Sequence, residues 1–408
     1  MSRLARVLIA GTSAATLISA ASFAEPINKV ELDQDQTGSV SSEDAQDADG
    51  VRDMVSTTLA QGNSATGALD GDSEISGRQT LDGGVTAQSL LSANGVWASV
   101  VSTATAQGNA LTASVGNGAL DLDIEQNAGA GQVSALSRLR ITDYAAHTVQ
   151  TASSAVNAVQ TSAEGGQDIA IRQSSASGSR AEARVDAADA EIETSVVGAV
   201  AAGNSLISTA EDEDSILTLD QSQSGATTAT ARAEIGNADY GVTAASQAAG
   251  NTATFQNDYG DSQTGGVQSN SGQVRSETVI LADQFANGYA TGSAHAVGNS
   301  ALTSTIGANT YSGVQQTNSG DVIANVTLTG GAGGGLGSVL NATAIGNAQS
   351  AYVCASCPVG VTGEINQINS GAISASSVST QSGQVRTMTS SATAVGNAAT
   401  FATQTRGD

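Results

Sequence analysis

His295-Ala-Val-Gly-Asn299, Thr343-Ala-Ile-Gly-Asn347 and Thr393-Ala-Val-Gly-Asn397 are three copies of one short motif. An Asn behind a run of small residues recurs along the whole chain, at Asn63, Asn109, Asn157, Asn204, Asn251, Asn299, Asn347 and Asn397. The separations between successive copies are 46, 48, 47, 47, 48, 48 and 50 residues. A nearly constant period of this length indicates a repeat architecture with one supersecondary unit per period.

The positions two and four residues before the motif Gly carry only Ala, Ser or Thr, as at Ala104 and Ala106. Side chains two residues apart lie on one face of a strand, so this face is expected to lie close to another backbone. In the third copy Val156 replaces the Gly while Asn157 is kept. The Asn is therefore the stricter requirement.

A second motif runs out of phase with the first and joins an aliphatic residue to a Gln and, a few residues later, a Gly. Clear copies are Leu32-Asp-Gln34, Leu219-Asp-Gln221, Val314-Gln-Gln316 and Ile365-Asn-Gln367. The equivalent positions of the other repeats hold Gln79, Gln126, Gln173 and Gln268. Each unit is therefore expected to have two corners of different chemistry, a Gly-Asn corner and a Gln corner.

Between these motifs, small or aliphatic residues alternate with polar ones, as in half-buried strands. We predict an all-β fold, a parallel β-solenoid (β-helix) of about eight 47-residue repeats, with equivalent positions stacked at about 4.8 Å. The helix-like stretch 179–199 is interpreted as strand. Whether a period forms one large coil or two of about half the size stays open. The expected limits are a lead-in at 25–33, a solenoid at 34–400 and a C-terminal tail at 401–408.

Stacking gives the recurrent amides a structural role. A buried Asn or Gln can donate to the side-chain carbonyl of its equivalent in the next coil, so each column of amides forms a ladder. We predict ladders of all eight Asn residues and of the Gln residues 34, 79, 126, 173, 221, 268, 316 and 367. The Gly before each Asn is expected to supply a positive φ or a close approach.

The first residues predict export. Arg3 and Arg6 precede an apolar stretch from Val7 to about Ala21, and Ser22-Phe23-Ala24 closes it, the pattern of a secretory signal peptide at 1–24. A membrane anchor is the alternative, but the apolar run is short and rich in Gly, Ser and Thr. The protein is therefore expected to be secreted, at the outer membrane or cell surface.

The chain has 14 basic and 38 acidic residues and a net charge of −24. Such a polyanion has little means of holding nucleic-acid phosphates, which bind to Lys and Arg. Aromatic residues make up 3% of the chain, so a thick core is not expected. This polarity is also typical of disordered proteins, but disorder gives no reason for a conserved phase over eight repeats.

Cys354 and Cys357 form a Cys-Ala-Ser-Cys sequence in the longest connection between motifs. In an exported chain a local disulfide between Cys354 and Cys357 is the favoured interpretation. A redox centre with this spacing needs a helix N-terminus to lower the thiol pKa, and the pattern predicts none.

Residues that could carry catalysis are few. His147 and His295 are the only histidines and lie at unrelated phases of the repeat. Acidic residues gather between each Gly-Asn motif and the next Gln, most densely at Glu211, Asp212, Glu213 and Asp214. A solvated negative edge is the simpler interpretation, and an irregular calcium site at those four residues is the alternative; no other metal or cofactor is expected.

Arginines concentrate in the third and fourth repeats, at Arg138, Arg140, Arg172, Arg180 and Arg184. Polysaccharide-cleaving β-helices place such residues beside carboxylates, so a glycan lyase or hydrolase is the enzyme alternative. Ion pairing with local Asp and Glu is the simpler account.

The signal peptide, the Ala-x-Gly-Asn repeats and the aliphatic-x-Gln motifs resemble the holdfast-anchor protein family of stalked alphaproteobacteria, in particular its D member. The resemblance implies a surface protein exported through an outer-membrane secretion channel, which works with sister anchor proteins to fasten an adhesive polysaccharide to the cell. The Gln and Gly-Asn motifs are also similar to curlin repeats, which are about half as long.

Together these features predict a non-enzymatic surface anchor or adhesin that holds a polysaccharide. A curlin-like amyloid subunit and a β-helix polysaccharide lyase or hydrolase are the alternatives. The open ends of a solenoid expose unpaired strand edges, so self-association is also expected.

Overall fold

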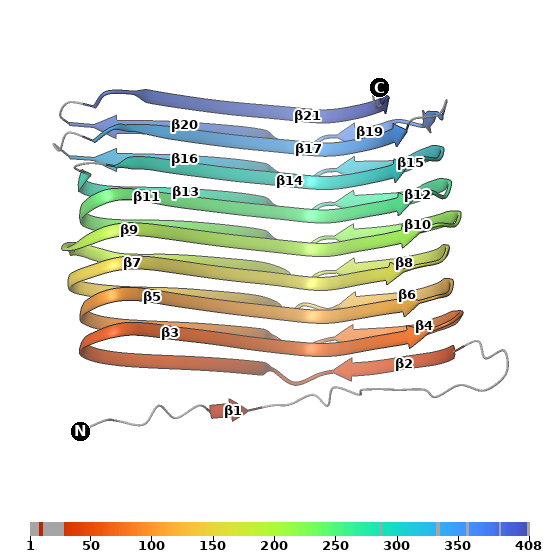
Figure 1. Cartoon of the computed structure of the whole chain (residues 1–408), viewed down its shortest axis with the longest axis horizontal. Coiled ribbons are helices and arrows are strands. Elements are labelled where there is room, and N and C mark those ends of the chain that lie inside the picture. Colours follow the sequence, from red (N-terminus) through yellow and green to blue (C-terminus); the bar gives the residue numbers. More distant parts are fainter. Residues whose placement is uncertain are drawn as a thin grey trace.

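The computed structural model describes residues 8–10, 28–285, 288–331, 335–355, 359–382 and 385–405. The predicted signal peptide therefore lies mostly outside the described residues. Figure 1 shows strands that follow one another as stacked coils, with residues 28–36 and residues 388–405 at opposite ends of the stack. The prediction of an all-β parallel solenoid is confirmed. No helix in the described part of the chain is long and apolar enough to cross a membrane.

Each coil consists of one short strand and one long strand. In the first five coils these pairs are β2 (Asn28–Gln36) with β3 (Val40–Asp70), β4 (Ser73–Leu81) with β5 (Val85–Gly116), β6 (Leu120–Ala128) with β7 (Gln132–Ala163), β8 (Gln167–Ser175) with β9 (Gly178–Glu211), and β10 (Ser215–Gln223) with β11 (Thr227–Asp258). The stretch 179–199 lies within β9, so its assignment as strand is confirmed.

In the last three coils the long strand is divided in two. The sixth coil has β12 (Ser262–Asn270), β13 (Val274–Phe285) and β14 (Tyr289–Ile306), and the seventh has β15 (Thr310–Asn318), β16 (Val322–Gly330) and β17 (Gly337–Ala355). The eighth has β18 (Val361–Gly363), β19 (Asn366–Asn369), β20 (Ile373–Gln381) and β21 (Met388–Thr405). The stacked strands thus begin at Asn28 and continue to Thr405, beyond the expected limits of 34–400.

The described strands pair as two parallel sheets, one of long strands and one of short strands. Neighbours stand in register one period apart, so that Asn204 pairs with Asn251 and Gln173 with Gln221. Each period is therefore one coil, which resolves the alternative left open above. A short additional strand, β1 (Leu8–Ala10), pairs antiparallel with Ser41–Glu43 at the edge of the first coil.

Each long strand bends round one end of the coil and returns, so that its second half faces the short strands (Figure 1). The register shifts that accompany this bend occur between Val51 and Asp53, and between Arg140 and Tyr144. The two layers of each coil can pack closely because the inward positions carry small residues such as Ala104 and Ala106, which are both fully buried.

Candidate functional site

The buried Asn residues form one continuous column. Each Asn donates from Nδ2 to the Oδ1 of its equivalent in the following coil, from Asn63 through to Asn397, over distances of 2.7–2.8 Å. The members from Asn109 to Asn347 are 0% exposed. A buried amide needs partners for both its donor and its acceptor, and the column supplies one of each.

The Gln residues form a second column of opposite direction. Each Gln donates from Nε2 to the Oε1 of its equivalent in the preceding coil, from Gln367 back to Gln34, over 2.6–2.8 Å. The Asn amides therefore donate toward the C-terminal end of the stack and the Gln amides toward the N-terminal end. The dipoles of the two columns oppose each other.

The second amide N–H of each side chain joins the two sheets. Asn204 Nδ2 donates to the backbone carbonyl of Ser222, directly after Gln221, at 2.9 Å. Gln173 Nε2 donates to the carbonyl of Ser205, directly after Asn204, at 3.1 Å. The same pair of bonds recurs along the stack, as at Asn251 and Gln221. Each coil is thus hydrogen-bonded across its interior as well as to its neighbours.

The amide columns divide the interior into two apolar compartments. One lies toward the bend of the long strands and contains mainly Ala and Val, such as Val133 and Ala183. The other lies toward the turn between long and short strands and contains larger residues, such as Ile124, Leu217 and Phe255. The thin interior of small side chains that the composition predicts is found only in the first compartment.

The expected Gly-Asn corner is wrong, because the motif lies inside the long strand. Before Gly108 the buried residues are Ala104 and Ala106, and after Asn109 they are Leu111 and Ala113, so the alternation changes phase at the motif. Gly and Asn both face inward there, and none of the motif glycines has a positive φ. The Gly is required by close approach: a Cβ on Gly108 would lie 2.4 Å from the Val156 carbonyl oxygen.

A third, shorter ladder was missed from the sequence. Asn270 donates to Asn318 at 2.7 Å, and Asn318 donates to Asn369 at 2.8 Å. The signal was present, because each of these Asn residues follows a ladder Gln by two positions and so shares its face.

The acidic residues lie at the turns between long and short strands, where several accept hydrogen bonds from the next coil. Asp72 Oδ1 accepts from the Ala119 backbone N–H, and Asp214 Oδ1 accepts from that of Asp261. Glu211 ends β9, Asp212 has a φ of 69°, and Glu213 accepts from the Gly166 N–H through Oε2. Among the described residues no group of three or more Asp, Glu, His or Cys is placed to hold a metal ion.

Like charges also stack on the outer face of the short strands. Glu74, Asp121 and Asp168 are successive partners in the sheet. Partial burial and the Asp168 carboxylate raise the pKa of Asp121. Lys29 pairs with Glu74 at 2.6 Å, and this contact raises the pKa of Lys29.

The five arginines do not form one cluster. Arg172 lies on the short strand β8 beside Asp123, whereas Arg138 and Arg184 both contact Asp186 from the long strands. Arg180 pairs with Glu182. A surface hollow of about 260 Å³ is lined by Arg138, Arg140, Arg184, Asp186 and Glu234, among others.

The histidines lie apart, as their spacing predicts. His147 is exposed near the bend and contacts Thr194, whereas His295 is part-buried in β14 and burial lowers its pKa. Cys354 is exposed near the end of β17. Cys357 lies outside the described residues, so the disulfide stays a prediction.

A surface hollow of about 480 Å³ lies at the turn edge of the fifth to eighth coils. Its lining includes Tyr311, Gln263, Asn309 and the carboxylates of Asp214 and Asp261. Asp261 Oδ1 accepts from the Asn309 backbone N–H at 2.8 Å, which orients the carboxylate. An aromatic ring can stack on the apolar C–H face of a sugar, and amides and carboxylates can hydrogen-bond to its hydroxyl groups.

The family model described as Holdfast attachment protein D matches residues 48–321. No curated protein and no solved structure matches the chain.

Proposed function

We propose that the chain, which belongs to the holdfast attachment protein D family, is a non-enzymatic surface anchor. In this role it attaches an adhesive polysaccharide to the cell envelope. The match over residues 48–321 is the observation that carries the proposal. It covers most of the stacked coils, so the role concerns the solenoid itself.

The architecture suits a protein that carries load. Adjacent long strands pair over about thirty residues, and each coil adds amide bonds to both neighbours. Because these bonds act side by side, separating two coils requires many of them to break together. A rod of this kind transmits tension with little extension.

Polysaccharide contact is assigned to the hollow around Tyr311. The Tyr311 ring and the amides of Gln263 and Asn309 offer stacking and hydrogen bonds, and the carboxylates of Asp214 and Asp261 favour neutral or amino sugars over acidic ones. The remaining expected partners are sister anchor proteins and an outer-membrane secretion channel. The expected location is the outer surface of the cell, after removal of residues 1–24.

The proposal is tested by deletion of the gene and complementation. Cells without the protein should shed adhesive material into the medium, and the wild-type chain should restore retention. Tyr311→Ala should restore surface display but only part of the retention, whereas Tyr352→Ala on the neighbouring β17 should restore both. Normal attachment of the deletion strain would refute the anchor role, and full retention by Tyr311→Ala would refute the assigned contact.

The arginine hollow supports the enzyme alternative, since Arg138 and Arg184 stand beside Asp186 in a depression of about 260 Å³. The family points to a structural role, and the ion pairs occupy the charges that such an enzyme would use. Release of oligosaccharides from holdfast material by the purified protein, abolished by Arg184→Gln, would favour the enzyme.

A further inference from the structure

The two ends of the stack expose strand edges that have the same path. The chain completes eight coils between Asn28 and Thr405. Among the described strands, β21 of the last coil pairs only with β17 and β20 only with β16, and β2 of the first coil pairs only with β4. The other strand of the first coil, β3, pairs with β5 and, at Ser41–Glu43, with β1, which lies in the predicted signal peptide and is missing from a chain that starts at Glu25. Each end therefore presents unpaired backbone groups in the register that the interior coils use.

The amide columns give the ends complementary hydrogen-bonding groups. At the C-terminal end Asn397 has one amide N–H beyond its bond to the Gln367 carbonyl, and Gln367 Oε1 has no following Gln to accept from. At the N-terminal end Asn63 Oδ1 has no preceding Asn, and Gln34 has one N–H beyond its bond to the Ser64 carbonyl. A donor at one end thus matches an acceptor at the other in both columns.

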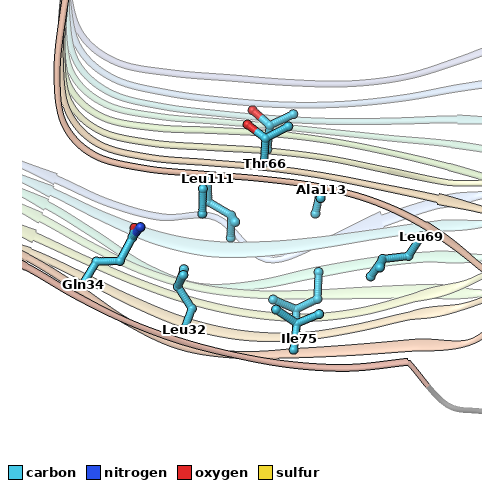
Figure 2. Close-up of a pocket in the computed structure, with 11 residues that line it drawn as sticks. Leu32, Gln34, Thr66, Leu69, Ile75, Leu111 and Ala113 are labelled. Atoms are coloured by element: carbon cyan, nitrogen blue, oxygen red, sulfur yellow. The ribbon is translucent and has the colours of Figure 1, made fainter. Parts of the chain in front are cut away.

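The ends also match in shape at one inward column. Successive pairing connects Gly67 in the first coil to Phe401 in the last, through Ala113, Thr161, Ser208, Phe255, Thr303 and Ala351. Beside Gly67 an apolar pocket of about 50 Å³ is lined by Leu32, Ile75 and Leu111. Figure 2 shows Leu32 and Ile75 pointing into the space between the layers from one side and Leu111 from the other.

The interior of the protein already contains such a packed ring. Phe255 occupies the same column in the fifth coil, between Ser208 and Thr303, and is 0% exposed. Phe401 in the last coil has Ala351 on one side and no coil on the other. A second copy placed on the stack would cover Phe401 with its own Gly67, where the pocket leaves room.

Charge and polarity select one orientation. Residues 28–72 contain ten acidic and two basic residues, whereas Glu364 and Arg386 are the only charged residues of the segment 359–405. Two N-terminal ends would therefore repel each other. Two C-terminal ends would set the free Asn397 donors against each other. Only the union of unlike ends continues both columns.

We propose that copies of this protein stack head to tail, with Phe401 of one copy seated beneath Gly67 of the next and both amide ladders running on through the joint. The contact is heterologous and does not close, so it builds a linear filament. Each copy adds eight coils at about 4.8 Å, or about 38 Å of length. The assembly is independent of which polymer the protein holds.

One residue opposes the joint and tunes its strength. Asp44 faces inward in the first coil, at a column that holds Ser89 and Ser137 in the second and third coils and uncharged residues in the coils that follow. Across the joint it would meet Ser377, whose column it shares. The Asp44 carboxylate at the open strand edge disfavours pairing with other strands before the joint forms. Once the joint forms, the Ser377 hydroxyl can donate a hydrogen bond to this carboxylate.

The test uses the chain that starts at Glu25, measured by sedimentation velocity over a series of concentrations and by electron microscopy. The wild type should form linear assemblies. Phe401→Ala, which removes the ring, and Gly67→Leu, which fills the pocket, should each weaken association at least about tenfold, as expected for a central contact. Asp44→Ser should strengthen it.

Two features of the chain provide controls. A Cβ on Gly67 has no atom within 4 Å, so Gly67→Leu should fold normally; Gly265 is equally open but lies in the middle of the stack, so Gly265→Leu should associate like the wild type. In a background without Cys354 and Cys357, Thr66→Cys with Thr400→Cys should give disulfide-linked oligomers, because these positions share one column and stand about 4.8 Å apart across the joint.

The pair Thr66→Cys with Thr393→Cys is out of register and should not cross-link. A wild-type chain that stays monomeric at every concentration would overturn the proposal. So would assembly that is unchanged in both Phe401→Ala and Gly67→Leu, or cross-linking that does not distinguish the two cysteine pairs.

Discussion

Replacement of one central rung of the Asn column measures what the ladder contributes. Asn204 is fully buried and takes part in three hydrogen bonds: it accepts from Asn157 and donates to Asn251 and to the Ser222 carbonyl. Asn204→Leu keeps the approximate size of the side chain and removes all three. The Asn157 amide hydrogen and the Asn251 Oδ1 are then left buried without that partner.

Each orphaned group costs about 1–3 kcal/mol, so the two side-chain groups together account for about 2–6 kcal/mol. The Ser222 carbonyl adds to this loss, and the apolar surface of Leu offsets part of it. We expect Asn204→Leu to lower the free energy of unfolding by about 3–5 kcal/mol. The loss should be concentrated in the coils that flank the substitution.

The matched control is Asn397→Leu at the end of the column. In the monomer Asn397 accepts from Asn347 at 2.8 Å and donates to the Gln367 carbonyl at 3.2 Å, but no coil follows it, so water can replace the lost partners. The expected loss is about 0.5–1.5 kcal/mol, because both hydrogen bonds lie where water can replace them. Urea unfolding gives the free energies, and hydrogen exchange of β7, β9 and β11 locates the change. Equal losses in the two variants, or unchanged exchange in β7 to β11, would refute a stabilising ladder.

Three further changes test other parts of the structure. Gly298→Ala should lower the melting temperature, since its Cβ would lie 2.5 Å from the Gly346 carbonyl oxygen, whereas Gly265→Ala should not; equal melting temperatures would contradict the close approach. Asp121→Asn should change stability by less than about 1 kcal/mol at neutral pH. The pKa of Asp121 is raised in the folded state, so its carboxyl group stabilises the fold at low pH and this stabilisation is lost as pH rises through that pKa. The melting temperature of Asp121→Asn should not show this fall. Burial lowers the pKa of His295, so folded protein binds fewer protons there and stability should be lost as pH falls below about 6.5; His295→Gln should flatten that loss, and an unchanged curve would count against the buried ring.

The sequence was sufficient for the fold class because its period is a physical constraint. Amides such as Asn204 and Asn251, one period apart among small residues, have few other ways to satisfy buried donors and acceptors than to stack. The alternation of residues around Ala104 predicts strands by the same local geometry. The acidic residues near Asp214 were likewise placed at one edge, since a turn is where charges remain solvated.

The prediction that the Gly-Asn motif forms a corner was wrong because Gly beside Asn is a common turn signal. A local sequence pattern does not show that a strand of another coil packs against the Gly. In the folded chain Gly108 instead makes room for the Val156 carbonyl and changes the phase of the strand.

Sequence by itself determined the repeat, the strands and the columns formed by the two recurrent amide motifs, because these follow from local alternation and from a period that side chains of equal kind can share. Tertiary structure alone decided that one period is one coil, that the two ladders run in opposite directions, and that Phe401 and Gly67 end the same column. The direction of a hydrogen bond and the fit between the ends depend on how distant residues are placed in space, and neighbours along the chain carry no record of that placement.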